Sequence, residues 1–125
     1  MISSHYIEGI ASVSDGDGLT IDNTAIDLFG IDAPAKETPN GTAAADFLYS
    51  LIEGMPVVAH CYGTQRSNRP ACMVAVDGED VGLKMLESGS AFVYEPTIPI
   101  YRAAVGHARK YSIGIWSSLP SEAVD

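Results

Sequence analysis

Positive charge is scarce in this sequence. Only 7 of the 125 residues are Lys or Arg, against 16 Asp or Glu, and the formal net charge is −9. Proteins that bind nucleic acid over a broad surface gain affinity by neutralising phosphates with Lys and Arg. The acidic balance therefore argues against a general polyanion binder and favours a solvated acidic surface. A local basic patch stays open at two places in the chain: Arg66 lies close to Arg69, and Arg102, Arg109 and Lys110 also lie close together.

Long hydrophobic runs are absent as well. No stretch approaches the roughly 18 consecutive apolar residues that a membrane helix requires, so we expect no membrane partner. Residues 1–8 lack the basic head and the apolar run of a signal peptide. This pattern predicts a cytoplasmic protein, or an extracytoplasmic one from which a leader has been removed. The sequence does not separate these two cases.

Cysteine is rare, since Cys61 and Cys72 are the only 2 in the chain. They form no CxxC motif, and no cluster of Cys and His has the spacing of a zinc site. His5, His60 and His107 are scattered, so we do not expect them to share a site. A hairpin between the two expected strands that carry the cysteines would bring them close enough for a disulfide. A secreted protein would favour the bond and a cytoplasmic protein the free thiols.

The length and the hydrophobic fraction of 46% correspond to one packed domain. Hydrophobic periodicity and turn signals predict its elements. The expected strands cover residues 6–13, 19–21, 24–31, 55–61 and 71–76, and the expected helices cover 42–53, 81–88 and 100–111. Five short strands with a helix after the third favour an α+β fold, a five-stranded Greek-key barrel of the OB type with three helices. We expect this domain to span residues 1–116 and a loose tail to span 117–125.

Two aspartates, Asp17 and Asp32, lie at the ends of neighbouring expected strands. Both have an ordinary structural explanation. Asp17 belongs to an Asp-Gly-Asp turn, and Asp32 precedes a proline-containing turn, where Asp is common. In the strand expected over 24–31, alternation would place Leu28 on one face and Ile31 on the other. The pair is therefore either a functional site or two turn residues.

Several segments match one known pattern in order and spacing. They are Val13-Ser-Asp-Gly-Asp17, Ile26-Asp-Leu-Phe-Gly-Ile-Asp-Ala-Pro34, Arg69 followed by Ala71-Cys-Met-Val-Ala-Val76, the stretch from Asp77 to Ala91, and Gly114-Ile-Trp116. Each segment alone is weak, because Asp-Gly-Asp and Asp-Ala-Pro are also general turn sequences. The ordered set resembles the staphylococcal nuclease-like family over nearly the whole chain.

The resemblance implies an OB-type barrel with three helices and, in well-known members, calcium-dependent cleavage of phosphodiester bonds in DNA and RNA. It also implies a metal site made of two aspartates and a backbone carbonyl. Carried over by position, Asp17, Asp32 and the carbonyl of Ala33 are the metal ligands, and Arg69 is a phosphate clamp. Such oxygens suit Ca²⁺ or Mg²⁺. The implied partner is single-stranded nucleic acid or a nucleotide, bound weakly; a protein partner stays open.

Several positions depart from the family pattern. Asp27 stands where the family has its first arginine, Ala35 stands where it has a glutamate, and Gly18 replaces a common threonine. Asp27 puts negative charge where phosphodiester hydrolysis requires positive charge. Ala35 neither accepts a proton nor orients water. Glu37 is the nearest carboxylate that could substitute, and only if the loop rearranges.

Two functional hypotheses follow. The first is a degenerate domain, a pseudoenzyme, that keeps a cation site and has weak or no phosphodiesterase activity. The missing arginine and glutamate and the acidic charge favour it. The second is a working metal-dependent nuclease that uses Asp17, Asp32 and Arg69 with substitutes such as Glu37 or Lys36, and the resemblance favours it. We prefer the first hypothesis, and the sequence leaves open whether the chain is an enzyme.

Overall fold

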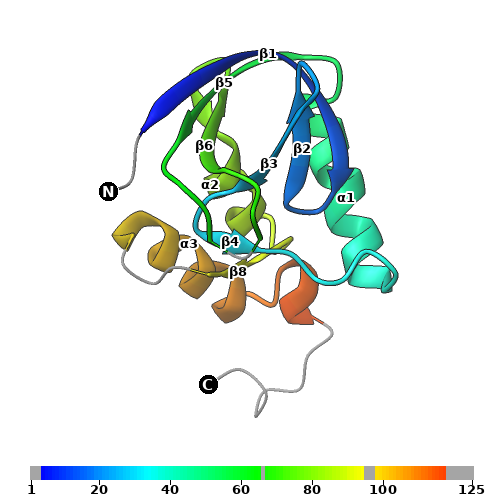
Figure 1. The fold of residues 1–125 in the computed structure, drawn as a ribbon. Helices are drawn as coiled ribbons and strands as arrows, with labels where there is room; N and C mark the ends of the chain where they lie inside the picture. The colour runs from blue at the N-terminus through cyan, green and yellow to red at the C-terminus, as the bar shows by residue number, and fades with distance from the viewer. Residues whose placement is uncertain (1–3, 66, 95–97, 118–125) are drawn as a thin grey trace.

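The computed structural model describes residues 4–65, 67–94 and 98–117. A small β-barrel lies beside three helices (Figure 1). The strands are β1 (His5–Asp15), β2 (Gly18–Ile21), β3 (Thr24–Leu28), β4 (Ile31–Asp32), β5 (Pro56–Cys61), β6 (Ala71–Val76), β7 (Glu79–Asp80) and β8 (Phe92–Val93). The helices are α1 (Pro39–Ile52), α2 (Val81–Glu87) and α3 (Pro99–Lys110), followed by the 3-10 helix η1 (Gly114–Ser117). The tail expected over residues 117–125 lies outside the described residues, apart from its first residue.

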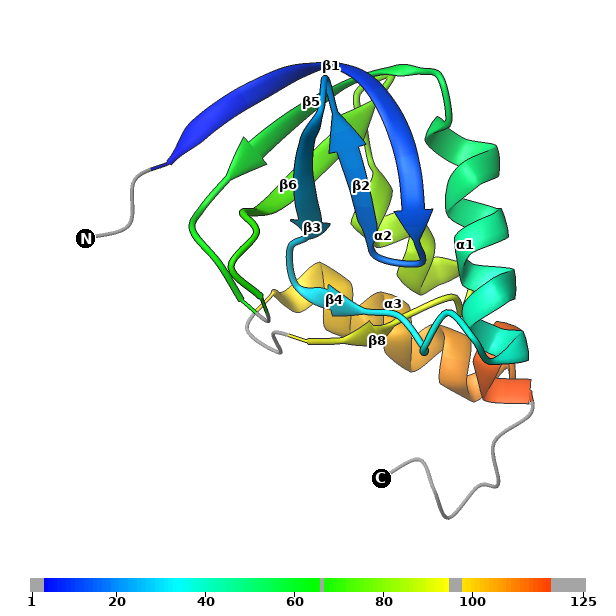
Figure 2. The same cartoon turned by 45° about the vertical axis from the view of Figure 1, so that its right-hand side comes forward.

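The barrel is built from five strands in the order β3-β2-β1-β5-β6, and a parallel pairing of β3 with β6 closes it. The long β1 curves across the top of the molecule in Figure 2. Its first half pairs with β5 and its second half pairs with β2, both antiparallel. The expected five-stranded barrel with three helices is therefore confirmed.

The three helices cover different parts of the barrel. Helix α1 packs against β1 along one side of the barrel, while α2 and α3 contact each other below the barrel in Figure 2. Strands β4 and β8 form a separate two-stranded sheet between the barrel and α3. None of the helices in the described ranges is long and apolar enough to cross a membrane.

The strand expected over residues 24–31 is interrupted. Strand β3 ends at Leu28, and β4 begins at Ile31 and leaves the barrel to pair with β8. Between them Gly30 adopts a φ of +81°, which glycine accepts without steric cost. The alternation of faces does not continue through this turn, so Ile31 is buried in the same core as Leu28. The prediction of one continuous strand with these residues on opposite faces was wrong.

Local capping explains where two helices begin. Helix α1 starts at Pro39, earlier than expected, because the Thr38 hydroxyl accepts a hydrogen bond from the Gly41 amide at 3.0 Å. Helix α2 starts as expected, after Asp80, whose carboxylate accepts from the Leu83 amide at 3.3 Å. Both helices therefore begin where a side chain satisfies an amide that lacks a partner within the helix.

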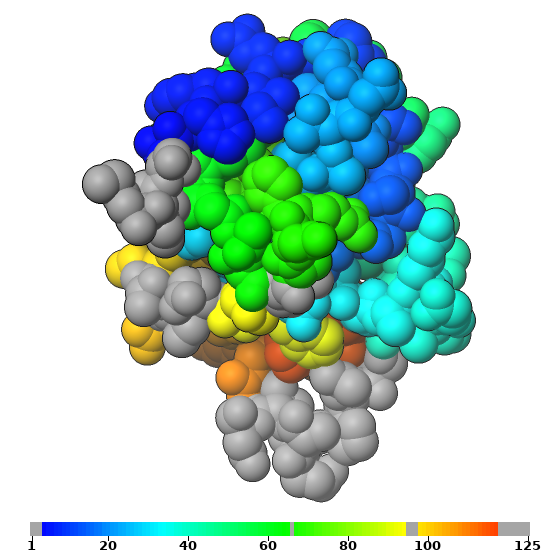
Figure 3. Space-filling view, in the orientation of Figure 1, coloured from blue at the N-terminus to red at the C-terminus, as the bar shows by residue number. Residues whose placement is uncertain are grey.

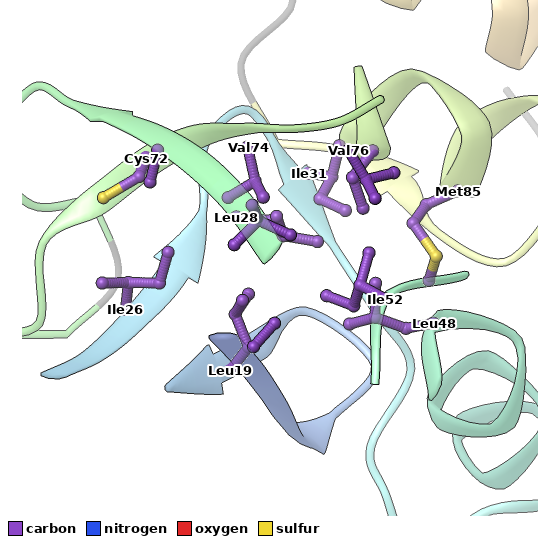
Figure 4. Packing of buried hydrophobic residues seen from close by; sticks show 14 of the residues in the cluster. Leu19, Ile26, Leu28, Ile31, Leu48, Ile52, Cys72, Val74, Val76 and Met85 are labelled. Atoms are coloured by element: carbon purple, nitrogen blue, oxygen red, sulfur yellow. The ribbon is translucent and has the colours of Figure 1, made fainter. Parts of the chain in front are cut away.

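The core fills the barrel and extends between the barrel and the helices. Figure 4 shows its central side chains, which come from β2, β3, β4, β6, α1 and α2. They include Leu19, Ile26, Leu28, Ile31, Leu48, Ile52, Val74 and Met85, each with at most 1% of its surface exposed. Tyr101 on α3 is also buried, and its hydroxyl donates to Asp80 at 2.8 Å. Burial, together with this carboxylate, raises the pKa of the Tyr101 hydroxyl.

Cys61 and Cys72 form a disulfide. They are direct partners in the antiparallel pairing of β5 with β6, and both are fully buried. The expected approach of the two cysteines in a hairpin is therefore confirmed. The bond closes the base of the loop between β5 and β6, hereafter the β5–β6 loop (residues 62–70), which carries Arg69.

Candidate functional site

The Asp-Gly-Asp turn between β1 and β2 holds Asp17 in a buried position. Only 7% of Asp17 is exposed, and its amide donates to Asp15 Oδ1 at 3.3 Å. A Cβ added at Gly16 would lie 2.7 Å from the Ala33 Cβ, closer than real side chains approach. Glycine at this position therefore lets the turn pack directly against the segment that follows β4.

The structure brings Asp17 beside the peptide that joins Asp32 to Ala33. The Ala33 amide donates to Asp17 Oδ2 at 2.8 Å, and the Asp17 carbonyl accepts from the Leu28 amide at 2.8 Å. Asp32 is half-buried in β4, opposite Phe92 of β8. The expected neighbourhood of the two aspartates is present, and their role as metal ligands stays a prediction.

Asp27 and Arg69 face each other next to this pair. Arg69 Nη1 lies 3.7 Å from Asp27 Oδ1, and the Asp27 side chain is 5% exposed against 41% for Arg69. The Ser67 hydroxyl donates to Asp27 Oδ2 at 2.8 Å and accepts from the Arg69 amide at 3.0 Å. The charge reversal at Asp27 is therefore compensated by the very arginine that the family pattern assigns to phosphate.

Gly18 lies directly across from Asp27 in the pairing of β2 with β3. A Cβ at Gly18 would lie 3.2 Å from Arg69 Nη1 and 2.7 Å from Asp15 Oδ1. The absence of a side chain at this position therefore gives the Arg69 guanidinium room to approach the turn. The Asp15 carboxylate lies beside this glycine, and Asp27 faces it across the pairing of β2 with β3.

Gln65 is a residue of the site that the sequence analysis missed. Its Oε1 accepts from the Gly30 amide at 2.9 Å, and its Nε2 donates to the Leu28 carbonyl at 2.9 Å. The Tyr94 hydroxyl donates to the Gln65 carbonyl at 3.1 Å. Figure 3 shows the β5–β6 loop, in green, in the middle of this face beside the cyan and yellow segments of β4 and β8. An isolated glutamine in a polar loop carries no sequence signal for this role.

The loop from Pro34 to Thr38 positions the N-terminal cap of helix α1. The Ala35 carbonyl accepts from the Thr38 amide at 2.9 Å and from the Thr38 hydroxyl at 2.7 Å. Lys36 Nζ donates to the Ser14 carbonyl at 2.8 Å, so its positive charge lies beside the Asp-Gly-Asp turn. Glu37 is exposed on this loop. The substitute roles of Lys36 and Glu37 remain untested.

The oxygen atoms at the site are of the kind that a hard cation prefers, but they are too few to complete its coordination. Among the described residues there is no group of three or more His, Cys, Asp or Glu side chains that could hold a metal. Asp17, Asp32 and the Ala33 carbonyl supply two carboxylates and one neutral oxygen, which are the donors that Ca²⁺ and Mg²⁺ prefer. A cation here would need water or substrate oxygens to complete its coordination, as Mg²⁺ sites commonly do.

Comparison with known proteins gives a consistent result. The family model described as staphylococcal nuclease homologue matches residues 25–118. An "uncharacterized endonuclease" of Escherichia coli O157:H7 is 32% identical over 115 residues, which cover 86% of this chain and 75% of that protein. A "probable endonuclease LCL3" of Phaeosphaeria nodorum is 31% identical over 128 residues, covering 86% of this chain and 43% of that protein. Because the family model matches more than half of the chain, including β5, β6 and all three helices, the chain belongs to the staphylococcal nuclease homologue family.

Proposed function

We propose that this domain holds a divalent cation, Ca²⁺ or Mg²⁺, at Asp17, Asp32 and the Ala33 carbonyl, and that it hydrolyses phosphodiester bonds weakly or not at all. Family membership supports a nucleic acid or a nucleotide as the ligand. The observation that carries the proposal is the buried carboxylate of Asp27, whose Oδ1 lies 3.7 Å from Arg69 Nη1.

Arg69 is the phosphate-clamp position that this chain keeps. Its guanidinium is paired with Asp27, so a phosphate must compete with a carboxylate whose side chain is only 5% exposed. The phosphate also meets the negative charge of that carboxylate, which raises the energy of the dianionic transition state. Loss of one preorganised electrostatic group costs ~10²–10³ in rate. The negative charge of Asp27 should lower the rate more than a neutral residue at the same position would.

Ala35 removes the group that would accept a proton from the attacking water. Loss of a general base costs roughly 10²–10⁴ in rate. This loss and the loss of the arginine need not multiply, because residues that act as a unit are not additive. Either one is enough to make the reaction slow by this route.

The cation site is affected differently, because neither Asp27 nor Ala35 is a metal ligand in the family pattern. The Ala33 amide orients the Asp17 carboxylate at 2.8 Å. Asp15 and Asp27 add negative potential nearby, which favours a cation. When bound, such an ion would polarise a phosphoryl oxygen.

Calorimetric titration of Ca²⁺ tests the cation site. We expect binding to the wild type and its loss in Asp17→Ala and in Asp17→Asn, because the asparagine keeps an oxygen for the Ala33 amide but lacks the charge. Asp22→Asn, an exposed aspartate in the turn between β2 and β3, is the charge-matched control and should bind normally. A wild type that binds neither Ca²⁺ nor Mg²⁺ would remove the proposal.

A working endonuclease is the second candidate. The relatives in Escherichia coli and Phaeosphaeria nodorum carry that word in their names. Lys36 lies beside the Asp-Gly-Asp turn and offers a positive charge, and Glu37 offers an exposed carboxylate on the same loop. In this alternative, Arg69 leaves Asp27 and binds phosphate when the substrate arrives.

Digestion of single-stranded DNA with Ca²⁺, Mg²⁺ or Mn²⁺ separates the two candidates. We expect little cleavage by the wild type. Cleavage that requires metal and disappears in Arg69→Ala would establish the second candidate instead. The double reversion Asp27→Arg with Ala35→Glu should raise cleavage if the family geometry applies. No change in the reversion would show that the assignment of positions around Asp32 is wrong.

A further inference from the structure

We infer that the C-terminal end of α3 is a binding surface for single-stranded nucleic acid, separate from the acidic site. We call this surface the α3 basic patch, and it consists of His107, Arg109, Lys110, Tyr111 and Trp116. The inference rests on the proposed function only in taking nucleic acid as the ligand. It does not require the cation site or catalysis.

Charge is the first observation. Residues 98–117 contain none of the 16 Asp and Glu residues and three of the 7 Lys and Arg residues, two of which, Arg109 and Lys110, belong to the patch. Two basic residues elsewhere, Arg69 and Lys84, form ion pairs with Asp27 and Glu79. Across the described part of the chain no carboxylate forms an ion pair with Arg109 or Lys110. Within the described residues, the end of α3 is therefore a locally positive part of an acidic protein, and it can attract phosphates.

Aromatic rings among the basic groups are the second observation. The Arg109 guanidinium lies 5.5 Å from the centre of the Trp116 ring, and Lys110 Nζ lies 5.5 Å from that of Tyr111. The His107 and Tyr111 ring centres are 4.7 Å apart, and Tyr111 is 58% exposed. Proteins that bind single strands combine phosphate-pairing cations with exposed rings on which bases stack.

Stabilisation of the helix explains the basic residues of the patch but not its exposed aromatic ring. Basic residues in a last turn interact favourably with the helix dipole, and His107, Arg109 and Lys110 occupy that turn. The dipole does not require an exposed aromatic residue directly after the helix, and Tyr111 is such a residue. An acidic protein partner would match the charge but would not need the ring either, so the patch fits nucleic acid better.

Position is the third observation, because the patch connects to the candidate site through two contacts. Asp32 pairs with Phe92 across β4 and β8. The Phe92 ring meets the Trp116 ring edge-on, with centres 5.4 Å apart, and Trp116 is covered by Arg109. Figure 2 shows β8 running between β4 and α3. A single strand that crosses β8 would reach both the patch and the aspartates.

The test is the affinity of a fluorescein-labelled oligothymidylate, measured by anisotropy in EDTA and at several salt concentrations. Arg109→Ala with Lys110→Ala should weaken binding about tenfold at low salt. It should also reduce the salt slope by about 1.4, because each contact to a single-strand phosphate contributes about 0.7. Tyr111→Ala, which removes an exposed ring after the helix, should weaken binding about fivefold.

Lys84→Ala with Arg102→Ala is the matched control, since it removes the same charge outside the patch and should change affinity much less. Equal losses in both double variants, or no binding by the wild type at low salt, would overturn the inference. So would polyglutamate that competes as well as the oligonucleotide while Tyr111→Ala binds normally, because the patch would then bind protein. Binding is measured without metal, so failure of the cation site leaves this test unaffected.

Discussion

At the scale of single residues, Asp27 has the largest consequence. A buried carboxylate without partners is strongly destabilising. Asp27 avoids this cost because Ser67 donates to Oδ2 at 2.8 Å and Arg69 lies 3.7 Å from Oδ1. The same ion pair means that a phosphate must compete with Asp27 for the Arg69 guanidinium. One substitution in β3 therefore changes both the charge of the site and the state of its remaining arginine.

Asp27→Asn should release Arg69 and increase the affinity for inorganic pyrophosphate. The asparagine is nearly isosteric and keeps an oxygen for the Ser67 hydroxyl, while the competing negative charge is gone. We expect a gain of about five- to tenfold, the range of a partly exposed charge interaction. Calorimetric titration of pyrophosphate measures it.

Asp22→Asn is the control for this change, because it alters the net charge equally at an exposed turn. A similar gain in both variants would mean that overall charge, and not the pairing of Asp27 with Arg69, limits anion binding.

At the scale of elements, the β5–β6 loop positions Arg69 in the candidate site. The disulfide between Cys61 and Cys72 closes its base, and Gln65 attaches it to the turn between β3 and β4 through Gly30 and Leu28. The loop thereby holds Arg69 opposite Asp27. Its order depends on contacts between segments far apart in the sequence.

Loss of the disulfide should destabilise the domain by about 2–3 kcal/mol, because a short covalent loop restricts the unfolded chain by roughly this amount. The Cys61→Ala, Cys72→Ala double variant and the reduced wild type should both unfold at lower urea than the oxidised wild type. Reductant should leave the double variant unchanged. Equal midpoints for the oxidised and reduced wild type, with the thiol state checked by mass spectrometry, would contradict the expectation.

At the scale of the whole molecule, charge is separated. The 16 acidic residues lie outside residues 98–117, and the candidate site includes the buried Asp17 and Asp27. Mutual repulsion of these charges opposes the compact state. The α3 basic patch lies at one end of this acidic molecule, so it can orient an approaching polyanion.

Salt should therefore stabilise the folded protein at pH 7. Raising NaCl from about 0.02 M to about 1 M shortens the screening length to about 3 Å and reduces the repulsion. We expect Tm to rise by a few degrees in a calorimetric scan. Near pH 4.5, the sequence pI, the net charge is close to zero and the same salt should raise Tm much less. A fall in Tm with salt at pH 7 would show that favourable ion pairs dominate.

Much of the fold was predictable because its signals are local. Turn sequences, helical periodicity and the Asp80 cap gave the order of elements and the barrel class. The strand over 24–31 was mispredicted because Gly30 reads as an ordinary strand position until its φ of +81° is known. Gln65 was missed because its value lies in contacts with Gly30 and Leu28, which no local pattern encodes.

The sequence by itself determined which groups exist: Asp17 and Asp32 as a predicted cation pair, Arg69 as a predicted phosphate clamp, and Asp27 and Ala35 where the family pattern has arginine and glutamate. The type of residue at each of these positions is read directly from the sequence. Only the tertiary structure decided that Asp27 faces Arg69. The two residues meet because β3 pairs with β6, which is distant in the sequence, when the barrel closes.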